Sequence, residues 1–219
     1  MTAPAPAPFR AVYRAFLGAY GPQHWWPGDG PFAVMVGAVL TQNTAWVNVE
    51  RALANLARAG CLSAEAIVGL PAPRLAELLR PSGYFNVKAG RLQELCAWLL
   101  ARGGLAALAA LATSRLRREL LAVKGIGPET AADILLFAFE RPVFVIDAYT
   151  RRVFGRLGLV DPGADYEDLR RVFESALGRR VAVMNEYHAL IVRHGKDVCR
   201  TRPRCGACCL ARRRPAREG

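Results

Sequence analysis

Long hydrophobic runs are missing from this sequence. No stretch of the 219 residues approaches the length of a membrane-spanning helix, and neither an internal repeat nor a long linker is present. The first ten residues, MTAPAPAPFR, lack the basic region and apolar run of a signal peptide. We therefore expect a cytoplasmic protein with no membrane partner. In that reducing compartment the six cysteines are not expected to form a disulfide framework.

Acidic residues are scarce as well: 18 Asp and Glu stand against 30 Lys and Arg, giving a formal net charge of +12 and a pI near 10.1. This excess predicts a polyanionic partner, above all nucleic acid, although an Arg-rich and Ala-rich genome would produce the same bias. Hydrophobic residues make up 53% of the chain, enough for a core in one large domain or two small ones. A disordered chain is thereby excluded.

The spacing of apolar residues is helical almost throughout and predicts an all-α fold. We predict helices over residues 9–20, 32–40, 45–59, 64–70, 73–79, 84–101, 166–177 and 181–192. Ser63 is expected to cap one helix, and Thr113 or Ser114 another. The apolar run at 143–146 is the one segment that resembles a strand, and the tail from His194 onward is expected to be irregular.

A short glycine-containing turn lies between two of the helical segments and consists of Lys124, Gly125, Ile126 and Gly127. Glycine lets the backbone turn sharply and approach a ligand closely, and Pro128 suits the first position of the next helix. The N–H groups of Gly125, Ile126 and Gly127 would then point outward as a phosphate site. A purely structural turn between helices is the alternative. Asp147 follows twenty residues after the second glycine.

Together these residues resemble a known family. LLAVKGIGPETAADILL followed by VFVIDAYTRRV is similar to the helix-hairpin-helix and catalytic Asp of the endonuclease III superfamily of DNA glycosylases. The similarity extends to LTQNT at 40–44, GYFNVKA at 83–89, His194-Gly195 and the tail cysteines. It implies an all-α fold of two helical domains with a DNA-binding cleft between them. Those domains would be residues 1–28 with 113–219, including a cysteine-bearing C-terminal loop, and 29–112, which carries DNA-wedge loops.

The resemblance places the hairpin at about 115–140 and implies a monomer that binds double-stranded DNA containing a damaged base. Family members hydrolyse an N-glycosidic bond after the damaged nucleotide has been flipped out. By similarity, Asp147 stabilises positive charge on the sugar and helps to activate the nucleophile. A helix-capping role for Asp147 is compatible with this chemistry.

One position departs from the bifunctional members, which carry a lysine two residues after the second glycine. That position is Glu129, and a carboxylate cannot form the Schiff base that leads to strand cleavage. The resemblance therefore implies a monofunctional glycosylase with weak or absent AP-lyase activity. Glu129 could also simply complement the helix dipole. Lys124 is expected to contact phosphate rather than to act as a nucleophile.

The substrate would be set by a base pocket. WWP and LTQNTAW resemble the 3-methyladenine glycosylase branch, in which aromatic rings sandwich the flipped base, and they supply Trp25, Trp26 and Trp46. An alkylated purine is electron-poor and stacks well on indole. The alternative is that these tryptophans fill the core. Alternative functions are a glycosylase, or glycosylase/AP lyase, for oxidised or mismatched pyrimidines, and a non-catalytic binder of damaged DNA.

Further DNA contacts follow from the same comparison. Gln42 would fill the gap left by the flipped base, and Tyr84 and Phe85 would wedge the opposite strand. Lys88 and Arg151 would be either phosphate contacts or structural cations.

The tail cysteines match the family pattern only in part. Members often hold a [4Fe-4S] cluster with four cysteines, and three of the four positions are filled here by Cys199, Cys205 and Cys208. The fourth position is Arg214, and an additional Cys209 follows the third cysteine. Three outcomes remain open: a cluster that uses Cys209, a cluster with a non-cysteine or open fourth site, and a loop without metal. A zinc site lacks the usual pairing of ligands.

Overall fold

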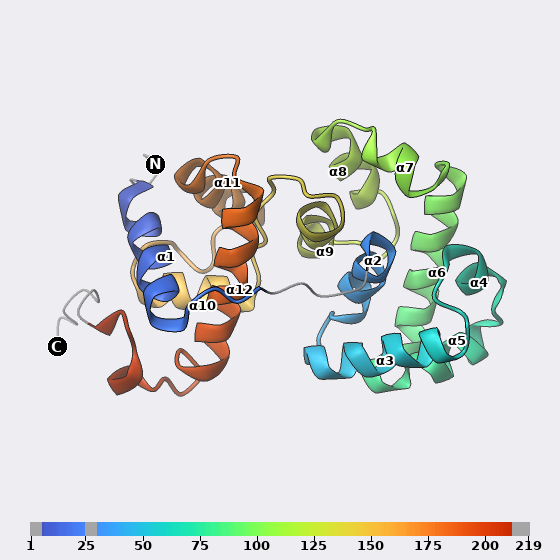
Figure 1. The fold of residues 1–219 in the computed structure, drawn as a ribbon, viewed down its shortest axis with the longest axis horizontal. Coiled ribbons are helices and arrows are strands. Elements are labelled where there is room, and N and C mark those ends of the chain that lie inside the picture. The colour runs from blue at the N-terminus through green and yellow to red at the C-terminus, as the bar shows by residue number, and fades with distance from the viewer. Residues whose placement is uncertain (1–5, 25–29, 212–219) are drawn as a thin grey trace. The chain divides into compact units, whose positions relative to one another are not determined.

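The computed structural model describes residues 6–24 and 30–211. The chain divides into two compact units, which are coloured along the sequence in Figure 1. The first, here called the aspartate unit, combines Met1–Trp25 with Pro142–Gly219, and the second, the hairpin unit, is Trp26–Arg141. The described residues form helices and turns without a strand, which confirms the predicted all-α fold.

The hairpin unit is built around one apolar helix, α2 (Pro31–Leu40), in which every residue from Ala33 to Leu40 is buried. A helix that is hydrophobic on all sides must be enclosed by its neighbours. The neighbours are α3 (Trp46–Arg58), α6 (Phe85–Ala101), α9 (Pro128–Asp133) and the π-helical segment η2 (Ile134–Ala138). The α2 ribbon accordingly lies among them in Figure 1.

Shorter elements complete this unit. They are α4 (Ala64–Gly69), α5 (Ala72–Leu79), η1 (Arg80–Ser82), α7 (Gly104–Ala109) and α8 (Thr113–Leu121). Helices α4 and α5 pack on α6, and η1 packs on α3. Asn55 of α3 also donates to the Leu78 carbonyl just before η1, at 3.0 Å.

The aspartate unit consists of α1 (Pro6–Tyr20), α10 (Ala148–Arg156), α11 (Tyr166–Leu177), α12 (Val181–Asp197) and η3 (Cys205–Ala207). Helix α1 packs on α11 and α12, far along the chain. Aromatic rings fill this core: Phe9 of α1 meets Phe173 of α11 edge-on with 5.0 Å between ring centroids, and it stacks on Phe154 of α10 at 5.5 Å. Both the beginning and the end of the chain therefore contribute to one core.

The division between the units differs from the predicted domain boundary at residue 112. Residues 113–141 group with the hairpin unit instead of the C-terminal unit. The physical reason is packing, because the side chains of η2 are all buried and η2 and α9 contact α2. The second passage of the chain between the units, at Arg141–Pro142, accordingly follows the hairpin instead of preceding it.

Helix ends test the predicted caps. Ser63 does cap α4, since its hydroxyl oxygen accepts a hydrogen bond of 3.2 Å from the Ala66 N–H. The prediction of Thr113 or Ser114 as a cap is wrong, because the extended backbone that starts α8 lies at Ala112 and its side chain offers no acceptor. Helix α12 also continues beyond the predicted 192 to Asp197.

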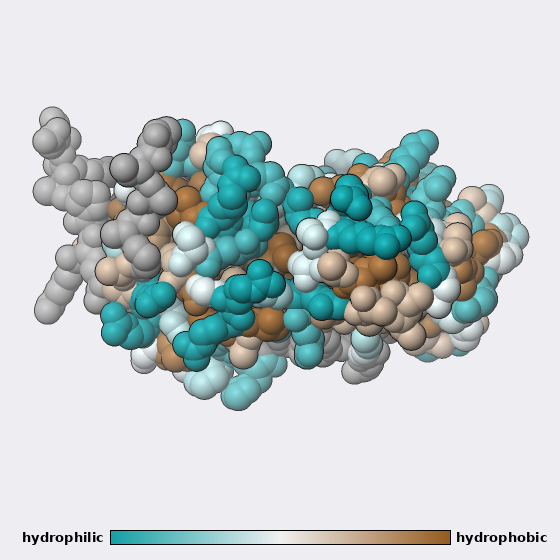
Figure 2. Space-filling view, turned by 90° about the horizontal axis from the view of Figure 1, so that it is seen from above, coloured by the Kyte–Doolittle hydropathy of each residue, from teal (hydrophilic) through white to brown (hydrophobic). Residues whose placement is uncertain are grey.

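Figure 2 shows hydrophilic side chains over much of the visible side, with hydrophobic areas that are small and separated. None of the helices within residues 6–24 and 30–211 has the length and apolar character needed to cross a bilayer.

Candidate active site

Asp147 is the N-cap of α10, in an extended backbone conformation with φ −98° and ψ 179°. Its Oδ1 accepts two hydrogen bonds from Thr150, one from the backbone N–H at 2.6 Å and one from the hydroxyl at 2.7 Å. The residue is buried, with 9% of its surface exposed. The same carboxylate thus caps the helix and is fixed in one orientation, so the two predicted roles are geometrically compatible.

The second oxygen of Asp147 faces His188, a residue that the sequence analysis did not select. The distance from His188 Nε2 to Asp147 Oδ2 is 3.5 Å, within ion-pair range. His188 lies on α12 and is 4% exposed. No spacing in the sequence relates it to Asp147, because only the packing of α12 on α10 brings the two together. A histidine inside the apolar run of α12 is the sole signal that could have drawn attention to it.

The environment keeps Asp147 ionised. Burial acts to raise the pKa of the carboxyl, but the charge of the nearby His188, 3.5 Å away, and the two hydrogen bonds from Thr150 act more strongly in the other direction. The pKa is therefore lowered from the ordinary value of Asp. At neutral pH the site holds a carboxylate anion, which can stabilise a positive charge that develops beside it.

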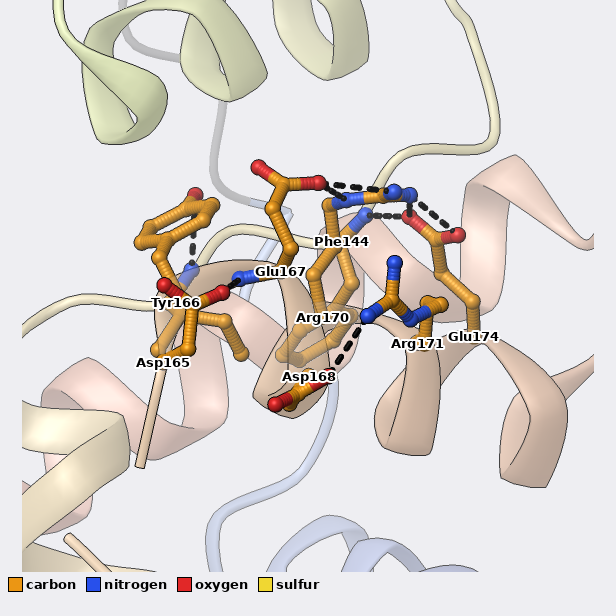
Figure 3. A network of polar contacts seen from close by, with 9 residues as sticks. Phe144, Asp165, Tyr166, Glu167, Asp168, Arg170, Arg171 and Glu174 are labelled. Atoms are coloured by element: carbon orange, nitrogen blue, oxygen red, sulfur yellow. Dashed lines mark hydrogen bonds and ion pairs between the residues drawn. The ribbon is translucent and has the colours of Figure 1, made fainter. Parts of the chain in front are cut away.

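The segment that leads into Asp147 is held by side chains of α11 (Figure 3). The Phe144 N–H donates to Glu174 Oε1 at 3.0 Å, and the Ile146 N–H donates to the Tyr166 hydroxyl at 3.3 Å. Arg170 in turn bonds Glu174 at 2.6 Å. These side chains replace the partner strand that an extended run would otherwise need, so the strand-like segment 143–146 stays unpaired and the backbone before Asp147 is fixed.

The predicted hairpin turn is present in the other unit. Gly125 has φ +88°, a left-handed conformation that favours glycine, and Gly127 is the N-cap of α9. The expectation that three N–H groups point outward needs correction, because the Ile126 N–H donates to the Val123 carbonyl at 3.1 Å within the turn. The N–H groups of Gly125 and Gly127 remain for a phosphate, and Lys124 beside them is exposed.

Gln42 lies against this turn. Its Nε2 donates to the Gly125 carbonyl at 3.2 Å and to Thr130 Oγ1 at 2.9 Å. Its Oε1 accepts a hydrogen bond from Arg91 Nη1. The residue predicted to enter the DNA gap is therefore docked on the hairpin, and Arg91, which the sequence analysis did not select, holds it there.

The second predicted DNA-wedge segment begins at Tyr84, the N-cap of α6. Tyr84 is 72% exposed and has a left-handed backbone with φ +45°. Phe85 is half-buried, with the Arg80 guanidinium 5.7 Å from its ring centroid. Of the pair, Tyr84 thus presents the larger free surface.

The two predicted cations have structural partners. Lys88 is 1% exposed, and its Nζ donates to the Leu40 carbonyl at 2.9 Å and the Ser82 carbonyl at 2.6 Å. Its buried position is incompatible with a phosphate contact, so of its two predicted roles only the structural one fits. Burial, with a smaller effect of the Arg91 charge, lowers the pKa of Lys88 to about 8. Arg151 Nη1 donates to two backbone carbonyls of the loop before α11, at 2.9 and 2.7 Å.

Of the predicted base-pocket tryptophans, Trp25 and Trp26 lie outside the described residues. Trp46 is the first residue of α3 and is half-buried. Its ring packs so closely on Gly37 of α2 that a Cβ there would lie 3.1 Å from the ring, and its Nε1 donates to Glu50 at 3.0 Å. Part of the Trp46 ring therefore fills the core.

The profile of the HhH-GPD superfamily of base excision DNA repair proteins matches residues 36–179, which contain the hairpin, Gln42 and Asp147. The chain belongs to the HhH-GPD superfamily. This match confirms the predicted resemblance to endonuclease III, and the protein is accordingly a DNA glycosylase of the base-excision repair superfamily with DNA as its partner.

Individual proteins of the HhH-GPD superfamily are similar to this chain over most of its length. A Methanocaldococcus jannaschii protein named as a candidate DNA repair glycosylase, MJ1434, is 42% identical over 200 residues, or 90% of this chain and 91% of that protein. Endonuclease III of Sulfolobus acidocaldarius is 28% identical over 181 residues, 82% of this chain and 79% of that protein. The solved H. pylori 3-methyladenine DNA glycosylase bound to 1,N6-ethenoadenine has a TM-score of 0.72 at 28% identity, covering 87% of this chain and 95% of that chain.

Two HhH-GPD features differ in this chain. Glu129, at the position of the family lysine, is exposed in the first turn of α9. In the tail, Cys199, Cys205 and Cys208 line one pocket together with His194, and the distance from Cys208 Sγ to His194 Nε2 is 3.8 Å.

Cys209 does not line that pocket and lies near the Tyr20 side chain instead. Among residues 6–24 and 30–211, no three His, Cys, Asp or Glu side chains converge as metal ligands. The described cysteines therefore do not fit a four-thiolate cluster.

Proposed function

We propose that this protein is a monofunctional DNA glycosylase that hydrolyses the N-glycosidic bond of a flipped alkylated purine, such as 3-methyladenine, in double-stranded DNA. The observation that carries the proposal is the buried, ionised Asp147 held by Thr150 and His188. Its support from the family is the match that spans the hairpin and this acid.

The chemistry follows from the charge of Asp147. As the bond from the sugar C1′ to the base nitrogen breaks, its electron pair leaves with the base and positive charge develops on the sugar. A fixed carboxylate opposes that charge without reorganising, and it orients a water molecule whose oxygen then bonds to C1′. The proton released by the water ends on the departing base or in solvent, and Asp147 stays a carboxylate throughout.

The replacement of the family lysine by Glu129 supports a reaction that stops at base removal. Schiff-base formation requires a lysine at the sugar, and Glu129 occupies the family position. Lys88 is buried and bonded to two carbonyls, which removes it as an alternative nucleophile. We therefore propose that AP-lyase activity is weak or absent, with Lys124 as the residue to suspect if it is found.

Two reasons favour an alkylated purine as the substrate: such a base stacks well on tryptophan side chains, and this chain is similar to a 3-methyladenine DNA glycosylase. Trp25, Trp26 and Trp46 would stack on an electron-poor base, whose glycosidic bond is already weak. The H. pylori 3-methyladenine DNA glycosylase, at 28% identity, was solved with 1,N6-ethenoadenine. We propose the same class of substrate, a modified purine, for this chain. We also propose that the protein is a monomer and is located in the cytoplasm, as expected from the sequence.

Mass spectrometry of bases released from damaged DNA tests the proposal. We expect methylated purines from alkylated DNA and no release from oxidised DNA, with Asp147→Asn as the inactive control. Release of oxidised or mismatched pyrimidines would show that the proposed substrate class is wrong and that the protein acts on pyrimidines. Tight binding to damaged DNA without any base release would instead favour a non-catalytic binder.

A further inference from the structure

Helix α6 carries two cationic side chains, one turn apart, that face the interior of the hairpin unit. Lys88 is almost fully buried, and Arg91 is half-buried three residues later on the same helix face. Neither forms an ion pair among the described residues of this unit. Lys88 instead donates hydrogen bonds to the backbone just before the predicted DNA contacts, and Arg91 donates to one of those contacts, Gln42.

Lys88 joins the backbones of two loops. Its Nζ reaches the carbonyl of Leu40, the last residue of α2, at 2.9 Å and the carbonyl of Ser82, the last residue of η1, at 2.6 Å. Gln42 follows the first carbonyl by two residues, and Tyr84 follows the second by two residues. An ammonium group carries three donors, so one lysine can serve both acceptors at once.

Both loops contain a residue with a left-handed backbone within three residues of these carbonyls. Asn43 has φ +55° and Tyr84 has φ +45°, left-handed conformations that side-chain-bearing residues avoid. Such conformations persist only where the surrounding structure holds the backbone in place, and they are concentrated at functional sites. The two hydrogen bonds of Lys88 supply such a hold for both loops.

Arg91 extends the same arrangement to the hairpin. Its Nη1 donates to Gln42 Oε1, and the Gln42 Nε2 donates to the Gly125 carbonyl and Thr130. The aliphatic stem of Arg91 covers Gly125 so closely that a Cβ at that glycine would lie 2.5 Å from Arg91 Cγ. The orientation of the Gln42 amide is thereby set, with its oxygen toward Arg91 and its NH₂ toward the hairpin.

We propose that Lys88 and Arg91 are positioning residues that hold the Gln42 loop, the Tyr84 loop and the hairpin as one preassembled DNA-binding surface. The inference rests on the proposed function, since it takes Gln42 and Tyr84 to be the residues that enter the duplex. A preassembled surface loses less conformational entropy when it binds, so the expected gain is in affinity for DNA with an open gap. Neither residue needs to touch DNA for this effect.

A double-mutant cycle tests the role of Arg91. The variants are Arg91→Met, Gln42→Ala and their combination, and the readout is affinity for a duplex with a stable abasic analogue opposite 2-aminopurine. Arg91→Met is expected to weaken binding about tenfold, as loss of one charge-assisted hydrogen bond does, and to change the 2-aminopurine fluorescence of the complex. In the Gln42→Ala background the same substitution should change affinity less than about twofold.

Equal losses in both backgrounds would overturn the inference, because Arg91 would then act independently of Gln42. Arg74→Met is the matched control: Arg74 is exposed on α5 of the same unit and pairs only with Glu77 among the described residues, so affinity should be unchanged. Arg91→Lys, which keeps a cationic donor, should restore part of the loss.

Lys88→Met provides the second arm, with Tyr84→Ala as its cycle partner. We expect Lys88→Met to lower thermal stability and to weaken DNA binding, with a smaller loss of affinity in the Tyr84→Ala background. Unchanged DNA affinity and unchanged 2-aminopurine fluorescence in Lys88→Met would contradict the inference. These measurements need no catalysis, so their outcome is separate from the proposed function. Absence of base release by the wild type would refute the glycosylase proposal, whereas additive cycles would refute the positioning role.

Discussion

Replacing Thr150 by valine removes one of the two donors that hold Asp147 Oδ1 and leaves the other in place. The hydroxyl donates at 2.7 Å and the backbone N–H at 2.6 Å, and Thr150 is buried. Valine has nearly the same shape, so the substitution isolates one hydrogen bond to a carboxylate. A hydrogen bond to a charged group contributes about 1.5–3 kcal/mol, and its loss weakens the preference of Asp147 for its ionised form.

The sign of the effect on pH dependence follows from the lowered pKa of Asp147. Base release requires the carboxylate, so activity is present above this pKa and is lost as pH falls through it. Thr150→Val takes away one of the causes that lower the pKa. The acid limb of the rate profile is therefore expected to move to higher pH, with a smaller loss of rate at neutral pH because the N–H and His188 still orient the carboxylate.

Single-turnover base release from alkylated DNA, corrected for spontaneous loss, measures this limb. Thr201→Val is the matched control, because it removes the same hydroxyl from an exposed residue of the same unit. An unchanged acid limb in a folded Thr150→Val protein would refute the reasoning, since the hydroxyl would then contribute nothing to the ionisation of Asp147.

Three further predictions concern other parts of the chain. Gly195→Ala should lower the free energy of unfolding by about 1–3 kcal/mol in chemical denaturation, because its Cβ would lie 2.5 Å from Tyr149 Cδ1, and an unchanged midpoint would contradict that packing. Borohydride should not trap a covalent complex with damaged DNA, and efficient trapping that disappears in Lys124→Gln would restore a lysine nucleophile. Cys209 lies outside the pocket lined by Cys199, Cys205 and Cys208. Cys209→Ser should therefore leave the iron content and visible absorption of anaerobically purified protein unchanged. A loss of iron in this variant would show that Cys209 is a cluster ligand.

What could be predicted from sequence is local. The hairpin turn and Asp147 stand in contiguous motifs, and helix positions follow from apolar spacing, so both were accessible without a structure. His188 and Arg91 were not, because each meets its partner through helix packing that no short motif records. The sequence left Lys88 open between a phosphate contact and a structural cation, because sequence does not show burial.

Errors at boundaries have a similar origin. The division after residue 141 depends on how η2 packs against α2, and the missing cap of α8 depends on which residue adopts an extended backbone. Both are decided by tertiary context instead of residue type. The run at 143–146 has strand-like composition yet receives its hydrogen bonds from α11 side chains, an arrangement that β propensity alone cannot foresee.

The most direct test of the central claim is base release by Asp147→Asn under single-turnover conditions, with DNA affinity measured in parallel. Asparagine keeps the shape and one acceptor oxygen for the Thr150 donors but removes the negative charge. The account predicts a rate loss of about a hundredfold or more, with affinity for damaged DNA retained. Release at the wild-type rate would contradict it, because the charge of Asp147 would then play no part in breaking the glycosidic bond.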